Sequence, residues 1–443
     1  MELRDFVSTP IILVVVYVVA FLLRPYVTDQ LTRQYFIPAL TVRVFGALAL
    51  GVVYQFYYDG GDTYNYHTGG SRIIWEAFMK DPLAGMQLIF QPVTNNQNLY
   101  EYTSRIYFAR DPNSYFVIRI AALFDIFTFS SYSGTAILFS VVGFVGAWLF
   151  FITFYRQFSE AHRGLAFATL FIPSVFFWGS GVMKDTIVLA GVGVATFSIY
   201  KIFIEKQRQV LYTFLLFVSL FLIYSIRIFV LQAFVPAILV WLFLIRMQSI
   251  RMVLVRILMV PFVAVALGVS VYYSVQQLGQ SSKYSLDNIV KTAAVTAYDI
   301  GYFTGRNAGS GYSVEVTEWT PLGMLQAAPA AINVSLFRPY LWEVRNPLML
   351  ISALESTFIL VFTVIILLRG FGRLSSALTS YNVVFCLVFA LIFSFAAGIS
   401  TFNFGTLTRY RIVALPFYVV ALVLLEYYSS SKRRNRGVLE TTE

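Results

Sequence analysis

Long apolar runs separated by short polar connections dominate the chain. A helix needs about 20 mainly apolar residues to cross the hydrocarbon core of a bilayer, so these runs predict about 11 membrane-spanning helices. They cover residues 10–23, 36–57, 134–155, 164–179, 186–204, 210–225, 229–246, 253–274, 348–368, 380–397 and 411–428. The expected fold is an all-α, polytopic transmembrane helical bundle, in which the first run is a retained helix because no small-residue cleavage site follows it.

Two connections, residues 58–133 and 275–347, are much longer than an ordinary loop. Loops of this length are either functional or contain structure of their own. Segments such as 71–79 and 322–334 mix apolar and polar residues, which predicts short helices lying in the membrane interface. Asp125 interrupts an otherwise apolar segment, which favours a re-entrant or interfacial helix there over a span.

Lysine and arginine residues cluster in alternate connections, all on one side of the predicted spans. The positive-inside rule makes that side cytoplasmic, together with the basic tail 429–443, and places the N-terminus outside. The external connections are then 58–133, 180–185, 226–228, 275–347 and 398–410. We expect residues 1–443 to form a single transmembrane domain in the cytoplasmic (inner) membrane, with its polar motifs on the external face.

The composition agrees with a multi-pass membrane protein surrounded by membrane lipids. The chain is 58% hydrophobic and 12% charged, with a mean hydropathy of +0.72, whereas about a quarter of the residues in a soluble domain are charged. The net charge of +10 comes from short clusters between the spans, so we expect no nucleic acid partner. A single cysteine, Cys386, excludes a disulfide within the chain and zinc sites of the Cys/His type.

The stretch 57–70 after the second apolar run carries the first candidate chemistry, with Asp59 and Asp62 flanking two glycines. Paired glycines allow a turn at positive φ, so both carboxylates could converge on one proton, one hydroxyl or one divalent cation. We predict that Asp62, Asp59 and His67 are catalytic, and that the two aspartates could hold Mg²⁺ or Mn²⁺. Arg72 is a candidate substrate ligand. The alternative is an interfacial turn of helix-capping aspartates and belt tyrosines.

A second polar turn, residues 178–185, separates two predicted spans. Its glycines shorten the turn, and we predict that Lys184 points at an anionic substrate with Asp185 beside it. In the alternative, Asp185 only caps the following helix and Lys184 only reaches lipid headgroups.

Two later stretches bring positive charge to the predicted external face. Arg338 and Glu343 precede the span that carries Glu355, and Arg409 and Arg411 open the last span. Positive charge is disfavoured on this face, and an intramembrane carboxylate is a functional candidate by default. A guanidinium group binds phosphate bidentately, so these arginines, with the lysine of the second turn, predict a site for an anionic substrate.

Together these stretches resemble the polytopic membrane glycosyltransferases of the GT-C superfamily and the related O-antigen-type polymerases of bacterial surface polysaccharides. The resemblance lies in four motifs: the acidic pair Asp59 and Asp62, the Ser-Gly-x-x-Lys-Asp turn 180–185, the Arg-Pro-x-x-Trp-Glu stretch 338–343, and the Gly-Thr-x-x-Arg-x-Arg stretch 405–411. The acidic motif here follows the second apolar run, whereas in the superfamily it usually follows the first helix and is tighter.

This resemblance implies transfer of a sugar from a polyprenyl-phosphate or polyprenyl-pyrophosphate carrier to a glycan or lipid acceptor, for polysaccharide biosynthesis in the cell envelope. Such transfer needs a base for the acceptor hydroxyl and cations for the departing phosphate, and the chain offers carboxylates and arginines. The alternative is a transporter or flippase for an anionic lipid-linked glycan. Broken helices and inverted repeats would favour the transporter, and their absence from the sequence pattern favours the enzyme. A scaffold subunit would need none of the external charges.

Overall fold

The computed structural model describes residues 3–92, 99–248, 310–314, 321–370, 379–401 and 403–440. Within these ranges every regular element is a helix, and the one β-type pairing is an isolated bridge between Gly311 and Asn403. The predicted all-α class is therefore confirmed for the described part of the chain. The chain divides into two compact units: a first unit of Met1–His162 with Thr169–Arg227, and a second unit of Arg163–Ala168 with Ile228–Glu443.

The described residues contain eight helices that are long and apolar enough to cross a membrane. In the first unit these are α1 (Leu3–Val27), α2 (Arg33–Phe56), α8 (Tyr132–Tyr155), α11 (Lys184–Ile199) with its continuation η5 (Tyr200–Glu205), and α12 (Gln209–Ile226). In the second unit they are α13 (Ile228–Gln248), α18 (Pro347–Gly370) and α20 (Tyr381–Ser400). The protein is therefore a polytopic helical membrane protein.

Breaks in two predicted spans are the main departure from the expected helices. The predicted span 164–179 is divided into α9 (His162–Ala166), η4 (Phe167–Phe171) and α10 (Pro173–Trp178), because Pro173 has no amide hydrogen to continue a helix and instead starts a new one. The predicted last span, 411–428, begins at the end of α21 (Phe404–Arg411) and continues in α22 (Leu415–Glu440). These two helices qualify as a ninth span only as a pair bent by 59°. The predicted span 253–274 lies outside the described residues.

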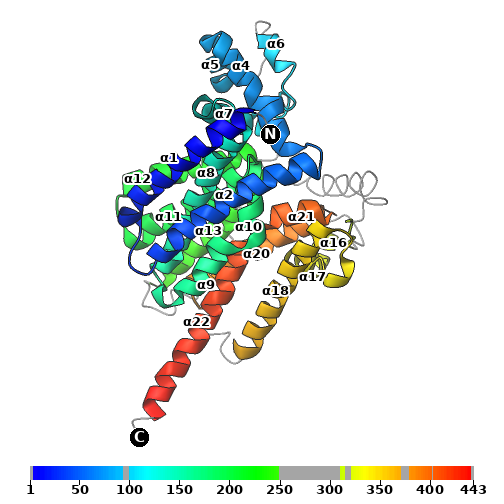
Figure 1. The fold of residues 1–443 in the computed structure, drawn as a ribbon. Helices are drawn as coiled ribbons and strands as arrows, with labels where there is room; N and C mark the ends of the chain where they lie inside the picture. Colours follow the sequence, from blue (N-terminus) through cyan, green and yellow to red (C-terminus); the bar gives the residue numbers. More distant parts are fainter. Residues whose placement is uncertain are drawn as a thin grey trace. The chain divides into compact units, whose positions relative to one another are not determined.

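Glycines bring the helices of the first unit together at backbone distance. Helix α8 packs against α1, α2 and α11, and Figure 1 shows these helices as one bundle. A Cβ atom at Gly146 of α8 would overlap with Ala190 of α11, and one at Gly193 of α11 would overlap with the carbonyl oxygen of Gly146. Small residues at such crossings allow membrane helices to approach closely.

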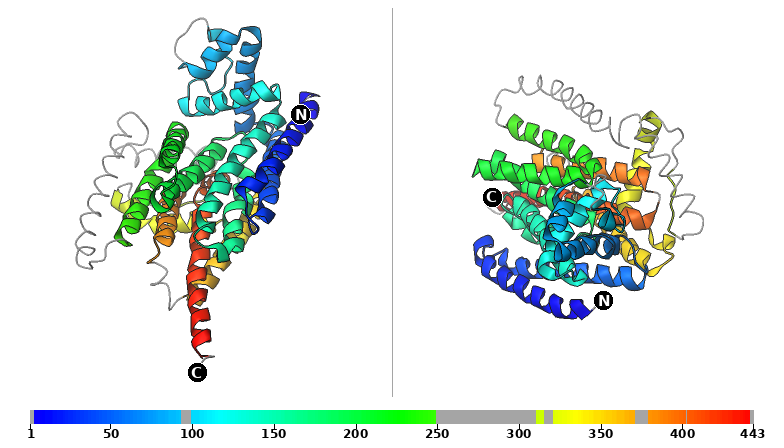
Figure 2. Two further views of the ribbon diagram at one scale, coloured as in Figure 1. Left: turned by 90° about the vertical axis from the view of Figure 1, so that its left-hand side faces the viewer. Right: turned by 90° about the horizontal axis from the view of Figure 1, so that it is seen from above.

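The long connection between α2 and α8, residues 57–131, contains structure of its own, as expected, and we call it the cap. Its helices are α3 (Asp62–Tyr66), η1 (His67–Ser71), α4 (Arg72–Lys80), α5 (Pro82–Phe90), α6 (Tyr100–Thr103) and α7 (Pro112–Thr128). Figure 1 and the left view of Figure 2 place α4 and α5 beyond one end of α2 and α8. The end of the bundle that carries the cap is called the cap end below.

In the second unit α20 is the central helix. It packs against α13, α22 and α17 (Ala328–Phe337), while α18 packs against α22. Trp241 of α13 stacks on Phe385 of α20 at a centroid distance of 4.3 Å and donates its indole N–H to Asn382 Oδ1 at 3.1 Å. The shorter helices α16 (Pro321–Gln326) and η7 (Leu341–Glu343) precede α18.

Candidate functional site

The acidic stretch forms a left-handed turn between α2 and α3. The φ angles are 53° at Asp59, 113° at Gly60 and 119° at Gly61, so the paired glycines adopt the positive φ that their sequence predicts. Gly61 is the N-cap of α3, and Asp62 is the first residue of that helix. Asp59 is exposed and Asp62 is half-buried, which leaves both carboxylates able to meet a substrate.

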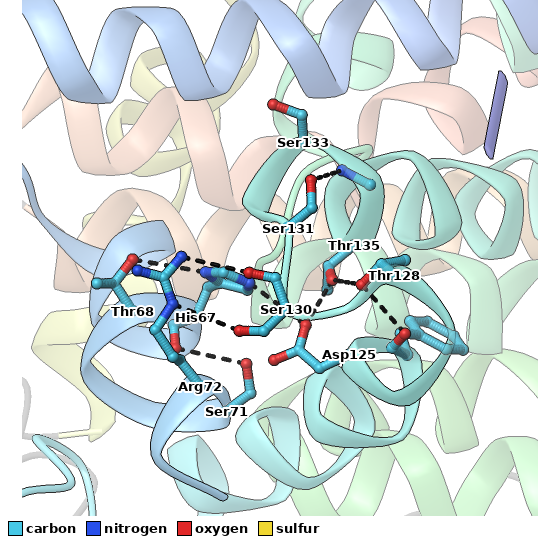
Figure 3. A network of polar contacts seen from close by, with 12 residues as sticks. His67, Thr68, Ser71, Arg72, Asp125, Thr128, Ser130, Ser131, Ser133 and Thr135 are labelled. Carbon is cyan, nitrogen blue, oxygen red and sulfur yellow. Dashed lines mark hydrogen bonds and ion pairs between the residues drawn. The ribbon is translucent and has the colours of Figure 1, made fainter. Parts of the chain in front are cut away.

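His67 lies inside the cap rather than in the acidic turn. Its Nε2 atom is 3.3 Å from Asp125 Oδ1, and neither side chain is exposed. Figure 3 shows the two side chains facing each other, with Thr135 donating a hydrogen bond to the same carboxylate. The ring of His67 also packs edge-on against Tyr132. This environment gives His67 a structural role in joining η1 to α7.

Arg72 extends the same network to the turn that precedes α8. Its Nε donates to Ser130 Oγ at 3.4 Å and its Nη2 donates to the Ser130 carbonyl at 3.3 Å (Figure 3). The neighbouring Ser131 donates to the buried carboxylate of Asp5 in α1 at 2.8 Å. The network therefore connects the cap to the first-unit bundle, and Arg72 is one of its members.

The acidic turn and the second polar turn meet at Lys184, the first residue of α11. Its ammonium group lies 3.2 Å from Asp111 Oδ2, and the charge of Asp62 acts on it more weakly than that of Asp111. Burial raises the pKa of Asp111, but hydrogen bonds from Ser114 and Lys184 outweigh that effect and hold the pKa below its ordinary value. Charges from three separate segments thus come together at one place in the first unit.

Asp185 is buried, 1% exposed, and is held by an arginine that the sequence analysis did not select. Its Oδ1 is 2.8 Å from Nη2 of Arg227, the residue that follows α12, and its Oδ2 is 3.0 Å from the same nitrogen. The N-cap of α11 is Met183, so Asp185 is an ion-pair partner and not the capping residue. The sequence signal for Arg227 was a lone charge between two apolar runs.

The second unit holds the other group of predicted residues, beginning with Arg338 and Glu343. Arg338 Nε lies 3.1 Å and 3.0 Å from the two carboxylate oxygens of Glu343. The hydrogen bond to Glu343 raises the pKa of Arg338. Burial raises the pKa of Glu343, but the hydrogen bonds from Arg338 and from the Tyr340 amide lower it overall. Both side chains are therefore ionised, and each neutralises the charge of the other.

Arg411 is fully buried at the end of α21. Its Nη2 is 3.2 Å from Glu355 Oε1, and its Nη1 donates to Ser356 Oγ at 2.7 Å and to the Arg338 carbonyl at 2.9 Å. The structure therefore brings together Arg338, Arg411 and their two glutamates in the second unit, whereas Lys184 belongs to the first unit. Arg409 lies on the same short helix and is half-buried.

The predicted site residues therefore form two clusters, one in each unit. Among the described residues, no three His, Cys, Asp or Glu side chains lie together as metal ligands would, so Asp59 and Asp62 have no third protein ligand of these types there.

No family model matches the chain, and no curated protein or solved structure is significantly similar to it. The assignment of a function therefore depends on the geometry of these clusters.

Proposed function

We propose that the chain is a membrane glycosyltransferase or polysaccharide polymerase that takes its sugar from a polyprenyl-phosphate-linked donor on the external face of the cytoplasmic membrane. One observation carries the proposal: the ammonium group of Lys184, at the start of a membrane-spanning helix, is held 3.2 Å from Asp111, in the same unit as the half-buried carboxylate of Asp62. Glycosyl transfer from a lipid phosphate requires a base and a cation at one place. In our proposal Asp62 supplies the base and Lys184 supplies the cation.

In this proposal Asp62 accepts the proton of the acceptor hydroxyl, and Lys184 stabilises the negative charge on the departing phosphate. As the alternative role for this turn, Asp59 and Asp62 would hold a Mg²⁺ or Mn²⁺ ion, because Mg²⁺ keeps several waters and binds through one or two carboxylates plus substrate phosphate. Such an ion would neutralise phosphate charge. The exposure of Asp59 leaves room for the remaining ligands.

The second-unit cluster supports the handling of a sugar. The paired Arg338 and Glu343 present donors and an acceptor together, which suits sugar hydroxyl groups. Beside them Tyr340 and Trp342 stack at a centroid distance of 4.7 Å, and Trp342 is 81% exposed. An exposed aromatic face next to a charged pair could hold a sugar ring, so we propose that Arg338, Glu343, Arg409 and Arg411 bind the substrate.

A transporter or flippase for an anionic lipid-linked glycan is the second candidate, and the broken helices favour it. Helices α9, η4 and α10 divide one predicted span, and α21 and α22 are bent by 59°. Discontinuous helices of this kind form the binding sites of many transporters. In this alternative the same charges bind the substrate without cleaving it.

Surface glycan composition in a deletion strain tests the proposal. The strain should lose one surface glycan, and the wild-type gene should restore it. Asp62→Asn should restore less than about 1% of the glycan, since a general base contributes about 10²- to 10⁴-fold. Asp81→Asn is the matched control, because Asp81 is an exposed cap residue of α5 in the same connection and asparagine caps helices equally well. Full restoration by Asp62→Asn at equal protein level would refute the proposed role of Asp62.

A further inference from the structure

The turn between α10 and α11, residues 179–183, packs against the middle of two spans. A Cβ atom at Gly46 of α2 would overlap with the Phe176 carbonyl oxygen of α10. One at Gly143 of α8 would lie 2.6 Å from the Gly179 carbonyl oxygen and 3.3 Å from the Thr186 methyl group. Since α8 begins at Tyr132, a rise of 1.5 Å per residue places this contact about 16 Å along α8 from its cap end. The start of α11 is therefore recessed within the helical bundle.

Arg43 lies at this depth and is the one arginine of the recessed region without a carboxylate partner among the described residues. It is 1% exposed, and its Nη1 donates to the Gly179 carbonyl at 2.6 Å. In the described part of the chain its Nε and Nη2 have no hydrogen-bond partner. Lys184 and Arg227, in contrast, are paired with Asp111 and Asp185. The recessed region thus carries one buried positive charge that the described residues do not neutralise.

The first turn of α11 adds backbone amide donors to this positive charge. The N-cap residue Met183 offers no side-chain hydrogen bond to the helix, and the first amides of a helix have no partner within it. A Cβ atom at Gly143 would lie 3.3 Å from Arg43 Nη1 and 3.3 Å from the Thr186 methyl group. The guanidinium of Arg43 therefore lies beside this turn. Helix N-termini with a nearby cation are ready-made sites for anions.

We propose that the recessed start of α11 is a phosphate-binding site, in which Arg43, the first amides of α11 and Lys184 bind the phosphate group of the substrate. The proposal rests on the proposed function only for the lipid-linked source of that phosphate. It differs from the sequence expectation, which assigned phosphate to Arg338, Arg409 and Arg411. Arg338 and Arg411 already have glutamate partners, and Lys184 would have to share its charge between Asp111 and the phosphate. Arg43 is the main contributor, because the described residues offer it no carboxylate and a phosphate would be its counterion.

A structural role for Arg43 is the competing explanation. Gly179 is the C-cap residue of α10, and basic side chains stabilise helix C-termini by hydrogen bonding the last carbonyls. A lysine at position 43 would preserve the capping role but not the phosphate-binding role. Lysine retains the charge and can donate to the Gly179 carbonyl, but it lacks the planar fork that binds phosphate bidentately. Arg43→Lys therefore separates the two explanations.

Binding to the purified full-length protein tests the proposal, with inorganic pyrophosphate and a short-chain polyprenyl phosphate as probes in isothermal titration. Wild type should bind at least one probe, and Arg43→Lys should weaken that binding at least 10-fold with an unchanged unfolding temperature without ligand. Arg156→Lys is the control, because Arg156 pairs with Glu205 at the other end of the bundle. Binding of both probes indicates that the site accepts free phosphate, and binding of the lipid alone indicates a lipid-linked source.

Equal affinity of Arg43→Lys and wild type would overturn the proposal and leave Arg43 as a helix cap. Absence of binding of either probe to wild type would overturn it as well. Neither result would remove the proposed transferase, because glycan restoration by the Asp62 variants is measured separately. Lys184→Met is the second variant in case Arg43→Lys unfolds, and unchanged affinity there would also contradict the site.

Discussion

At the residue scale, most buried charges in the described part of the chain are neutralised by a partner within the same unit. Asp185 is paired with Arg227, and Glu355 is paired with Arg411. Burying two charges costs desolvation energy that their attraction offsets only in good geometry, whereas removal of one partner leaves an uncompensated charge. We therefore expect a variant of a structural ion pair to lose stability, and a variant of a ligand site to lose binding.

Asp185→Asn should destabilise the first unit because it leaves Arg227 buried without a counter-charge. The expected loss is about 3–5 kcal/mol of unfolding free energy. The double variant Asp185→Asn with Arg227→Met should recover part of that loss, because the unpaired charge is gone. Chemical denaturation of the purified protein measures the coupling. Strictly additive effects would show that the two side chains do not act as a pair.

The pair of Arg338 and Glu343 predicts a pH dependence. The folded state holds the pKa of Glu343 below its ordinary value of 4.5, so the ionised pair stabilises the fold above that pH. The stabilisation is lost as the pH falls through the folded pKa. At pH 7, Glu343→Gln should lower the unfolding free energy by about 1.5 kcal/mol, the value of a charged hydrogen bond.

Thermal unfolding of wild type and Glu343→Gln across the acid range checks this prediction. The difference between the two proteins should shrink as the pH falls below 4.5. A difference that stays constant through the acid range would show that the glutamate stabilises the protein by packing rather than by charge.

At the scale of elements, the position of α11 depends on glycines that allow backbone contact. Gly146→Val should disrupt the crossing of α8 and α11, since a side chain there overlaps with Ala190. Overpacking of this kind costs about 1–3 kcal/mol. Gly69→Ala is the control, because its Cβ would meet Tyr107 at an ordinary 3.6 Å. Thermal unfolding should show a clear loss for Gly146→Val alone, and equal stability of the two variants would contradict the close crossing.

The sequence predicted most elements but not the breaks within them. Hydropathy predicted about 11 spans, and eight of them have a counterpart among the described helices because the bilayer demands long apolar helices. Periodicity cannot show that Pro173 starts a new helix or that Phe167–Phe171 form a π-helix, since those residues are as apolar as a span. The start of α11 was therefore expected at an external turn and lies halfway along α8.

Sequence reasoning about the site succeeded where residues were close together in the chain. Asp59, Asp62 and the paired glycines formed the turn that their order predicts. Arg43 and Arg227 were missed because each is a lone charge in or between apolar runs, where only tertiary contacts reveal its partner. His67 was selected for its chemistry, but its burial against a distant aspartate could not be read from spacing.

At the scale of the whole molecule, the orientation of the chain in the membrane is a prediction from its charges. Single-cysteine variants at Tyr58 in the cap and at Ser431 in the C-terminal helix should label from opposite sides of intact cells. The native Cys386 is buried and should give little background. A membrane-impermeant thiol reagent should reach Tyr58→Cys from outside and Ser431→Cys only after lysis. Labelling of both from outside would contradict the predicted orientation and the external location of the acidic turn.

Sugar transfer by the purified protein in proteoliposomes is the direct test of the proposed glycosyltransferase activity. The substrate is a polyprenyl-phosphate donor with a radiolabelled sugar, offered with a membrane extract as the source of acceptor. The account predicts that wild type releases polyprenyl phosphate and labels the acceptor, that Asp81→Asn matches it, and that Asp62→Asn is slower by about 100-fold or more. Passage of the intact donor across the bilayer without cleavage, or an undiminished rate in Asp62→Asn, would contradict it.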